Sequence, residues 1–312
     1  MQEIKVQRLK NNPIIYPAMD ESLSRNINGP SLICVPKWIK NPLGQYHLYF
    51  ASHKGSYIYL AYANDLEGPW HIYKNGTLHL EQSLFPTTPS VEESNYFGDD
   101  AYQGSDRTAP HIASPDVHIH KKTQEFRMYY HGLLPNGSQM TRVARSKDGI
   151  HFLPEPSIIS PAYFRVFLYN NWYYGMSMPG IFYRSQNGIN NFEMGPIRFN
   201  RNMRHSALRV EGNILQVFWT QVGDSPERIL LSTINLSKNW LKWKESPAIE
   251  ILRPEFEWEG GILKSRPSVR GPINETVCQL RDPAIYEEED RIYLLYSIAG
   301  EFGIAIAELK GL

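Results

Sequence analysis

The chain has 312 residues, of which 42% are hydrophobic and 21% charged, so it is long enough to bury a large core in one domain or two smaller ones. Lysine and arginine together number 32, as do aspartate and glutamate. This balance provides no overall field that would attract nucleic acid or an anionic membrane surface, and we therefore expect a neutral partner.

The first residues, MQEIKVQRLKNNPIIYP, contain a short strand pattern at residues 3–9 but lack the apolar core of a secretory signal. No later window approaches an uninterrupted apolar span of membrane length. These features predict a cytoplasmic protein that does not contact a membrane. The two cysteines, Cys34 and Cys278, lie in apolar runs without metal-binding spacing and are expected to be plain buried thiols.

The rest of the chain repeats one pattern. Each unit has a strand, a tight turn, an aromatic strand, a longer loop, a third strand, and a turn that leads to a short strand opening with Trp or Phe. Repetition of a four-stranded unit is typical of a β-propeller, and here it predicts an all-β, five-bladed propeller. The expected blades are residues 28–75, 111–157, 160–200, 204–250 and 280–309.

The fifth unit, RDPAIYEEEDRIYLLYSIAGEFGIAIAEL, has only three strands. The N-terminal strand at residues 3–9 has no partner in the first unit. If it completes the last blade, the ring closes and its exposed sheet edges disappear. We therefore predict a single domain over residues 1–312.

Two long polar segments, residues 76–110 and 244–279, interrupt the repeat and are expected to be loops with a function. Both lead from a fourth strand to the first strand of the next blade. Because strands in a blade are antiparallel, these connections and the loops after the second strands emerge on the same face. That face is predicted to carry Asn28, Asp116, Arg165, His205 and Asp282 from the first strands, and His53, His131 and Glu301 from the loops.

A pocket ringed by carboxylates, histidines and arginines suits a polyol, because these groups hydrogen-bond hydroxyls. Two carboxyl groups across a glycosidic bond can also act as general acid and base if the pKa of one is raised. The sequence therefore predicts a carbohydrate partner.

The blade openings SPDV and RDPAI, the aromatic strands YLLYS and MYYHG, and the closing segments ARSKDG and ANDLEGPW resemble the five-bladed propeller superfamily of glycoside hydrolase family 43 and its relatives, families 32, 68, 117 and 130. The resemblance covers all five blades. It implies an enzyme that acts on a glycosidic bond.

In family 43 an Asp opens blade one as the general base, an Asp in blade two tunes pKa values, and a Glu opens blade three as the general acid. SPDV places Asp116 on the second of these. Blade one instead opens NGPS, with Asn28 at the position of the base, and blade three opens SPAYFRV without a carboxylate. An Asn side chain cannot accept a proton from water at neutral pH, so the acid and base here must be atypical.

Two carboxyl groups are the expected replacements. Asp282 opens blade five, and the neighbouring Arg281 would keep it ionised as a base or hydroxyl acceptor. Glu301 lies among apolar residues that would raise its pKa and suit it to act as an acid. The candidate catalytic residues are thus Asp116, Asp282 and Glu301.

The candidate substrate-binding residues are Asn28, His53, His111, His131, Arg165, His205 and Arg281. His53 and His131 occupy matching loop positions in blades one and two. His205 resembles the fourth-blade histidine that in family 43 approaches an axial calcium or water. Apart from calcium near His205, no cofactor and no metal site are expected.

Three functions remain open from the sequence: hydrolysis of a glycoside, its phosphorolysis by a phosphate held among the arginines and histidines, and sugar or partner binding without catalysis. The carboxylates Asp99, Asp100, Glu257 and Glu259 in the long loops are read as ordinary loop residues.

Overall fold

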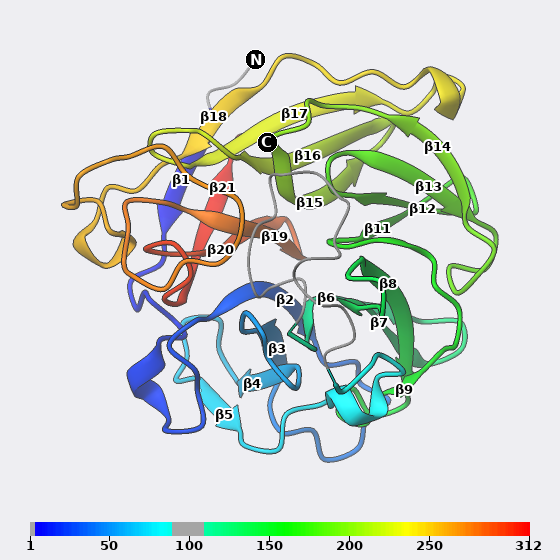
Figure 1. Cartoon of the computed structure of the whole chain (residues 1–312), viewed down its shortest axis with the longest axis horizontal. Helices are drawn as coiled ribbons and strands as arrows, with labels where there is room; N and C mark the ends of the chain where they lie inside the picture. Colours follow the sequence, from blue (N-terminus) through cyan, green and yellow to red (C-terminus); the bar gives the residue numbers. More distant parts are fainter. Residues whose placement is uncertain (1–3, 89–108) are drawn as a thin grey trace.

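The computed structural model describes residues 4–88 and 109–312, which form five antiparallel sheets arranged in a ring (Figure 1). Blade one contains β2 (Asn28–Cys34), β3 (Tyr46–Ala51), β4 (Tyr59–Ala63) and β5 (His71–Tyr73). Blade two contains β6 (Ile112–His120), β7 (Glu125–Leu133), β8 (Gln139–Ser146) and β9 (Leu153–Pro154), with β10 (Ser160–Pro161) also paired to β8. The prediction of an all-β, five-bladed propeller is confirmed.

The remaining blades follow the same order from the axis outwards. Blade three contains β11 (Arg165–Tyr169), β12 (Trp172–Ser177), β13 (Ile181–Ser185) and β14 (Glu193–Ile197). Blade four contains β15 (Met203–Glu211), β16 (Ile214–Gln221), β17 (Ile229–Asn235) and β18 (Ile249–Leu252). Blade five contains β19 (Arg281–Glu288), β20 (Arg291–Ser297) and β21 (Ile304–Lys310).

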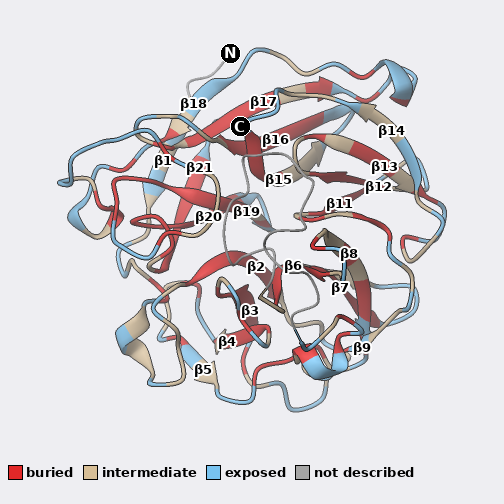
Figure 2. Ribbon diagram, in the orientation of Figure 1, coloured by how far each residue is buried: buried red, intermediate tan, exposed pale blue. Residues whose placement is uncertain are grey.

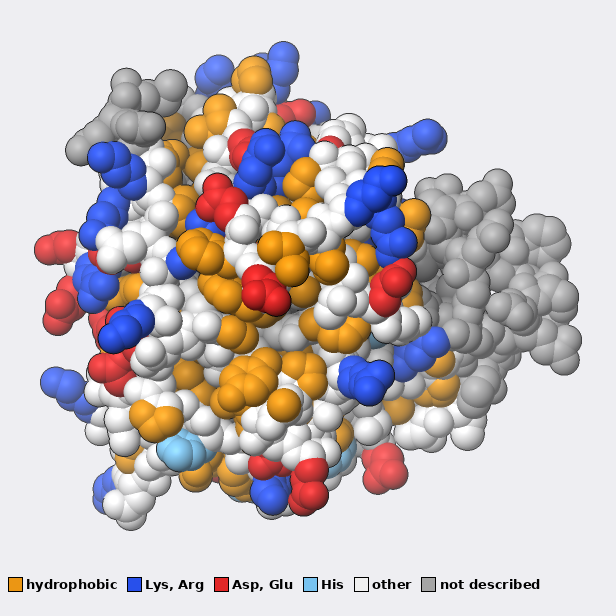
Figure 3. All heavy atoms as spheres, turned by 90° about the vertical axis from the view of Figure 1, so that its left-hand side faces the viewer, with side chains coloured by type: hydrophobic (Ala, Val, Ile, Leu, Met, Phe, Trp, Pro, Cys, Tyr) orange, Lys and Arg blue, Asp and Glu red, His pale blue; other side chains and the backbone are white. Residues whose placement is uncertain are grey.

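The N-terminal strand completes blade five, as predicted. Strand β1 (Lys5–Arg8) pairs antiparallel with β21, in a register that sets Lys5 opposite Lys310 and Arg8 opposite Ala307. Figure 3 shows the side of the molecule where these strands lie, with acidic and basic side chains interspersed among apolar ones.

Five hydrophobic clusters fill the five interfaces between blades. Side chains alternate between the two faces of a strand, so one strand serves two interfaces. In β3, Leu48 and Phe50 pack towards blade five against Leu295, whereas Tyr49 packs towards blade two against Met128. The inner strands are correspondingly buried (Figure 2). This packing fixes the positions of the strand ends that surround the axis.

Short 3-10 helices lie in the connecting loops at Pro17–Met19, Leu80–Gln82, Trp240–Lys242 and Glu257–Glu259. Within the part of the chain that the structure describes, no helix is long and apolar enough to cross a membrane.

The innermost strands begin with a recurring backbone feature. Residues with positive φ occur at Gly29 (60°), Ser114 (51°), His205 (40°) and Asp282 (46°), each within a β-bulge at the start of its strand. In blade three, Tyr163 (58°) precedes β11 in the same way. Bulges re-aim side chains, and a non-glycine residue held at positive φ commonly marks a functional site. All five features lie at the strand ends nearest the predicted site face.

Candidate active site

Asp282 is a buried carboxyl group at the bulge that opens blade five. Its Oδ1 lies 3.5 Å from Nε2 of His205, which occupies the corresponding bulge in blade four. Its Oδ2 is buried and has no hydrogen-bond partner among the described residues. The two positive-φ residues of adjacent blades thus face each other.

Glu301 lies in the loop between β20 and β21 and is also buried. Its carboxylate accepts hydrogen bonds from Arg281 at 2.8 Å and from the side-chain amide of Asn26 at 2.6 Å. Nδ1 of His53, from the matching loop of blade one, is 3.3 Å from the carboxylate. These contacts hold Glu301 in one orientation between blades one and five.

The pKa values of the two carboxyl groups are pushed in opposite directions. Burial, and after it the negative charge of Glu301, raise the pKa of Asp282 to about 7 against the opposing effect of nearby arginines. Burial alone would raise the pKa of Glu301 as well, but His53, Arg281 and Asn26 outweigh it and hold this pKa well below its usual range. One carboxyl group is therefore protonatable near neutrality and the other stays ionised.

This result reverses the roles expected from the sequence. Arg281 was expected to keep Asp282 ionised, but its guanidinium donates to Glu301 and to the side chain of Gln279 instead. Glu301 was expected to have a raised pKa in apolar surroundings, and it is instead bound by cationic and amide donors. Both predictions of pKa direction were wrong, because sequence neighbours did not become contact partners.

A row of aromatic rings continues from His205 across blades three and two. The centroids of His205 and Tyr163 are 4.9 Å apart, as are those of Tyr163 and His131, and His111 follows at 5.8 Å from His131. Burial lowers the pKa of His131 and of His205 well below the ordinary value, and neighbouring cationic groups add to this. Both histidines are therefore neutral at physiological pH and can donate or accept hydrogen bonds.

Arg165 lies at the start of β11 and is buried. Its guanidinium donates to the carbonyl oxygens of Ser206 at 3.0 Å, Pro115 at 2.8 Å and Ser114 at 3.3 Å. It therefore joins the inner strands of blades two, three and four. Its charge also lowers the pKa of both Asp282 and Asp116.

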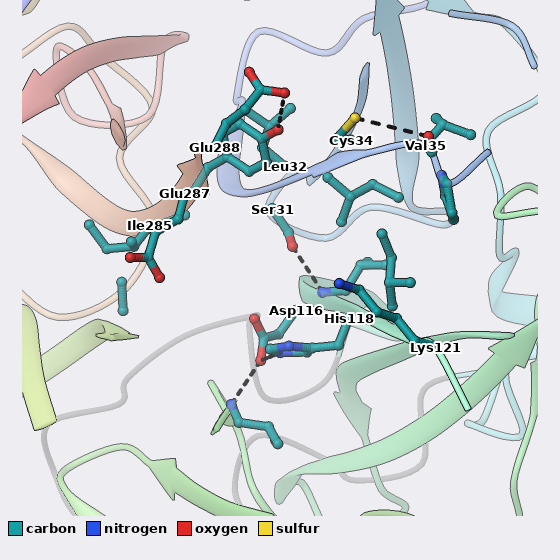
Figure 4. Close-up of a pocket in the computed structure, with 18 of the residues that line it drawn as sticks. Ser31, Leu32, Cys34, Val35, Asp116, His118, Lys121, Ile285, Glu287 and Glu288 are labelled. Carbon is teal, nitrogen blue, oxygen red and sulfur yellow. Dashed lines mark hydrogen bonds and ion pairs between the residues drawn. The ribbon is translucent and has the colours of Figure 1, made fainter. Parts of the chain in front are cut away.

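Asp116 does not join Asp282 and Glu301. It lines a cavity of about 500 Å³ whose walls include residues of all five inner strands, among them Ser31, Asp116, Arg165, Ala207 and Ala284 (Figure 4). Neither Asp282 nor Glu301 lines this cavity. Asp116 Oδ2 accepts hydrogen bonds from Nε2 of His118 at 2.8 Å and from the backbone of Val166 at 2.9 Å. Its carboxylate thus faces the opposite end of the axis.

Asn28 is buried, and its amide donates to the side-chain oxygen of Asn26 at 2.8 Å. It therefore supports the residue that binds Glu301. The strand registers set Asn28 opposite Ala51 and Arg281 opposite Ser297, so Gly29 is the counterpart of Asp282. The position expected for a blade-one base is thus occupied by a glycine, one residue after the predicted Asn28.

Sequence reasoning did not select several residues of this cluster. Tyr163 lies between His131 and His205 but gave no motif, since nothing in SPAYFRV indicates a bulge. Arg204 and Glu227 form a buried ion pair with bonds of 2.9 and 2.5 Å. Their mutual contact, which the sequence does not show, marks them as part of the site. Asn26 lies one turn before the blade and carried no signal.

The carboxylates of the long loops are not assigned to the site. Glu259 is fully buried and binds Arg8 and the hydroxyl of Tyr296, so it is structural. Asp99 and Asp100 lie outside the described residues. Among the residues that the structure describes, no group of three or more His, Cys, Asp or Glu side chains gathers as metal ligands. The calcium near His205 stays a prediction.

Comparison with solved structures places this architecture in a known class. A GH130 structure, from a study of mannoside phosphorylases and of glycoside hydrolases that target β-1,2 mannosidic linkages in Candida mannan, has a TM-score of 0.63 at 9% identity, covering 97% of this chain and 93% of that one. A glycosyl hydrolase from Bacteroides ovatus also has a TM-score of 0.63, at 11% identity and with the same coverages. The fold is that of the five-bladed glycoside hydrolase propellers, which confirms the resemblance seen in the sequence.

No protein-family model matches the sequence. The uncharacterized protein R118 of Acanthamoeba polyphaga mimivirus is 36% identical over 338 aligned residues, which cover 98% of this chain and 91% of R118. The chain therefore belongs to the same protein family as mimivirus R118.

Proposed function

We propose that the protein is a glycoside hydrolase in which Asp282 is the general acid and Glu301 is the ionised carboxylate of the site. The observation that carries this proposal is the opposed pKa values of two buried, electrostatically coupled carboxyl groups at the axis. Such a pair is the usual arrangement for cleavage of a glycosidic bond, in which one group donates a proton and the other faces the developing positive charge.

In this mechanism the proton on Asp282 passes to the glycosidic oxygen as the bond to the anomeric carbon breaks. Glu301 remains negative, because Arg281, Asn26 and His53 hold it in the ionised form, and its charge stabilises the oxocarbenium-like transition state. Neutral His205 contacts Asp282 and accepts or donates a hydrogen bond without competing for the proton at neutral pH. Water then adds to the anomeric carbon and loses a proton to the Asp282 carboxylate, which restores the protonated acid.

Unpartnered polar atoms support a carbohydrate as the substrate. The side chains of Ser114 and Ser297, Nδ1 of His131 and Oδ2 of Asp282 are buried without hydrogen-bond partners among the described residues. Each belongs to the inner or second strand of blade two or five, near its end on the site face. A buried polar atom without a partner is costly, and the hydroxyl groups of a sugar can satisfy both donors and acceptors.

Phosphorolysis is less well supported than hydrolysis. A phosphate substrate requires arginine donors that are available to it. Arg165 donates to three backbone carbonyls, Arg204 is paired with Glu227, and Arg281 is paired with Glu301. The charges of the last two arginines are thus already balanced.

The test is release of reducing sugar from a panel of aryl glycosides and oligosaccharides, with and without inorganic phosphate. We expect turnover that does not depend on phosphate and that falls by about 10²–10⁴-fold in Asp282→Asn, the usual range for loss of a general acid. Turnover that survives in this variant would contradict the proposal. If nothing turns over but sugars raise the melting temperature, the protein binds carbohydrate without catalysis. A cytoplasmic location is part of the proposal and is tested by cell fractionation.

A further inference from the structure

Asp282 is surrounded by arginines but pairs with none of them. Arg281, Arg204 and Arg165 all act electrostatically on its carboxyl group. Its contact within ion-pair distance among the described residues is instead Nε2 of His205, at 3.5 Å. An aspartate beside an arginine ordinarily forms a short, charge-assisted hydrogen bond. The structure must therefore hold each arginine elsewhere.

Each guanidinium is committed to other acceptors. Arg165 donates to three backbone carbonyls, as described above. Arg281 donates to the Gln279 side chain at 2.7 and 3.2 Å and to Glu301 at 2.8 Å. Arg204 donates through Nε and Nη2 to the two carboxylate oxygens of Glu227, at 2.9 and 2.5 Å, and through Nη1 to the carbonyl of Val269 at 3.3 Å.

Among these acceptors, Glu227 is the one whose removal would most change how the arginines are held. It is fully buried in the loop between β16 and β17, and its Oε2 is also 3.5 Å from Nε of Arg281. Its backbone carbonyl accepts a hydrogen bond from the Leu280 amide, two residues before Asp282. Glu227 is thus anchored to the strand that carries Asp282 while it binds the arginine that precedes His205.

We propose that Glu227 is a positioning residue that holds Arg204 away from Asp282 and so leaves Asp282 free for proton transfer. This inference rests on the proposed function for its catalytic meaning, but the contact itself is independent of activity. Without Glu227, Arg204 would be a buried cation with one weak backbone bond. The acceptor open to it is Oδ2 of Asp282, which has no partner among the described residues.

The charged and titratable groups that face Asp282 come from several elements. A test of Glu227 must leave all of them unchanged. They are Arg165 from β11, Arg204 and His205 from β15, Arg281 from β19, and Glu301 from the loop after β20, with His53 behind Glu301. The substitution Glu227→Gln changes none of these residues. It removes one charge and retains the size of the side chain.

The experiment is a carbon-13 carboxyl titration of the full chain, with the Asp282 signal assigned from its loss in Asp282→Asn. In Glu227→Gln we expect the pKa of Asp282 to fall by about two pH units, as is usual for a carboxylate that gains an arginine partner. The protonated fraction at pH 7 then falls about fifty-fold. Turnover at pH 7 falls by the same ratio, and the alkaline limb of kcat/KM moves to lower pH.

Two further variants separate positioning from damage to the fold. The double variant Glu227→Gln with Arg204→Met removes the released cation, so the pKa of Asp282 should return to near 7. Glu125→Gln is the matched control, because Glu125 is another buried glutamate that binds an arginine, Arg127 at 3.0 Å, in blade two. It should destabilise the fold without changing the pKa of Asp282.

An unchanged pKa of Asp282 in Glu227→Gln would overturn the inference, even if turnover falls. So would a double variant that fails to restore it. If the wild type cleaves no glycoside while the titration behaves as expected, the proposed function fails and the positioning role stands. If turnover depends on Asp282 but the pKa of Asp282 does not change in Glu227→Gln, the proposed function stands and the positioning role fails.

Discussion

The guanidinium of Arg8, from the N-terminal strand, forms two hydrogen bonds with the buried carboxylate of Glu259, at 2.7 and 3.0 Å. Glu259 belongs to the long loop between blades four and five, and it also accepts a hydrogen bond from the Tyr296 hydroxyl at 2.8 Å. The strand that closes the ring is therefore attached through Arg8 to a loop residue 251 positions later in the chain, and through Glu259 to β20.

Arg8→Met should destabilise the fold by about 3–5 kcal/mol, since it leaves the fully buried Glu259 without its cation. Urea unfolding followed by tryptophan fluorescence measures the loss. Arg253→Met is the control, because Arg253 forms a similar pair with Glu250 on the surface, where about 0–1 kcal/mol is expected. Equal effects of the two substitutions would mean that the Arg8 side chain contributes little to closure.

The rate of glycoside cleavage should fall as the pH rises through about 7. Asp282 must be protonated to donate, and its pKa of about 7 places the loss of the proton there. The alkaline limb of kcat/KM against pH in the free enzyme reports this pKa. An alkaline limb near pH 4 to 5 would assign the proton to a carboxyl group with an ordinary pKa.

Asp282 should also make stability depend on pH. Its pKa is raised on folding, so the folded state binds the proton more tightly, and this contribution is present at pH 4 and lost by pH 8. The buried histidines His205 and His131 have the opposite effect on stability. Because folding lowers their pKa, they destabilise the folded state as the pH falls below 6.5. The difference in unfolding free energy between wild type and Asp282→Asn isolates the effect. Relative to the variant, the wild type should lose on the order of 2–4 kcal/mol from pH 4 to pH 8.

Asp116→Asn should leave turnover within about threefold of the wild type, well short of the loss expected when a general acid is removed. Its carboxylate faces the cavity at the other end of the axis and is bound by His118 and the Val166 amide. The measurement is kcat/KM with the best substrate of the panel, beside Asp282→Asn. A loss of kcat/KM as large as that of Asp282→Asn would show that Asp116 is a catalytic residue, as the sequence predicted.

Gly175→Ala tests the packing between blades two and three. A Cβ atom at Gly175 would lie 2.1 Å from Cζ of the buried Phe164, so the ring must move. We expect a destabilisation of about 1–3 kcal/mol, typical of an overpacked core. In a Phe164→Leu background the same substitution should cost less, and a double-mutant cycle measures the coupling. Additive effects would indicate that the ring relaxes freely.

The fold could be predicted from the sequence because its signal is repeated. Five aromatic strands with similar turns, an N-terminal strand without a partner and a last unit with only three strands define the blades without knowledge of any contact. The period of two in a strand explains why the adjacent residues Leu48 and Tyr49 pack into different interfaces.

The candidate site was predicted only in part. Asp282, Glu301, His53, His131 and His205 do come together, because the repeat shows which loops share a face. The pKa directions could not be predicted, since they depend on whether Arg281 turns to Asp282 or to Glu301. The place of Asp116 also depended on the bulge, which sets Ser114 at the site position and directs Asp116 to the other cavity.

The pairing of β1 with β21 has a consequence for synthesis of the protein on the ribosome. Residues 5–8 emerge well before their partner strand, residues 304–310, which is translated almost 300 residues later. Contacts of such high sequence separation form slowly. Four blades can assemble as the chain emerges, whereas β1 has no partner until β21 has been translated. Until then it is exposed to binding by chaperones or by other nascent chains.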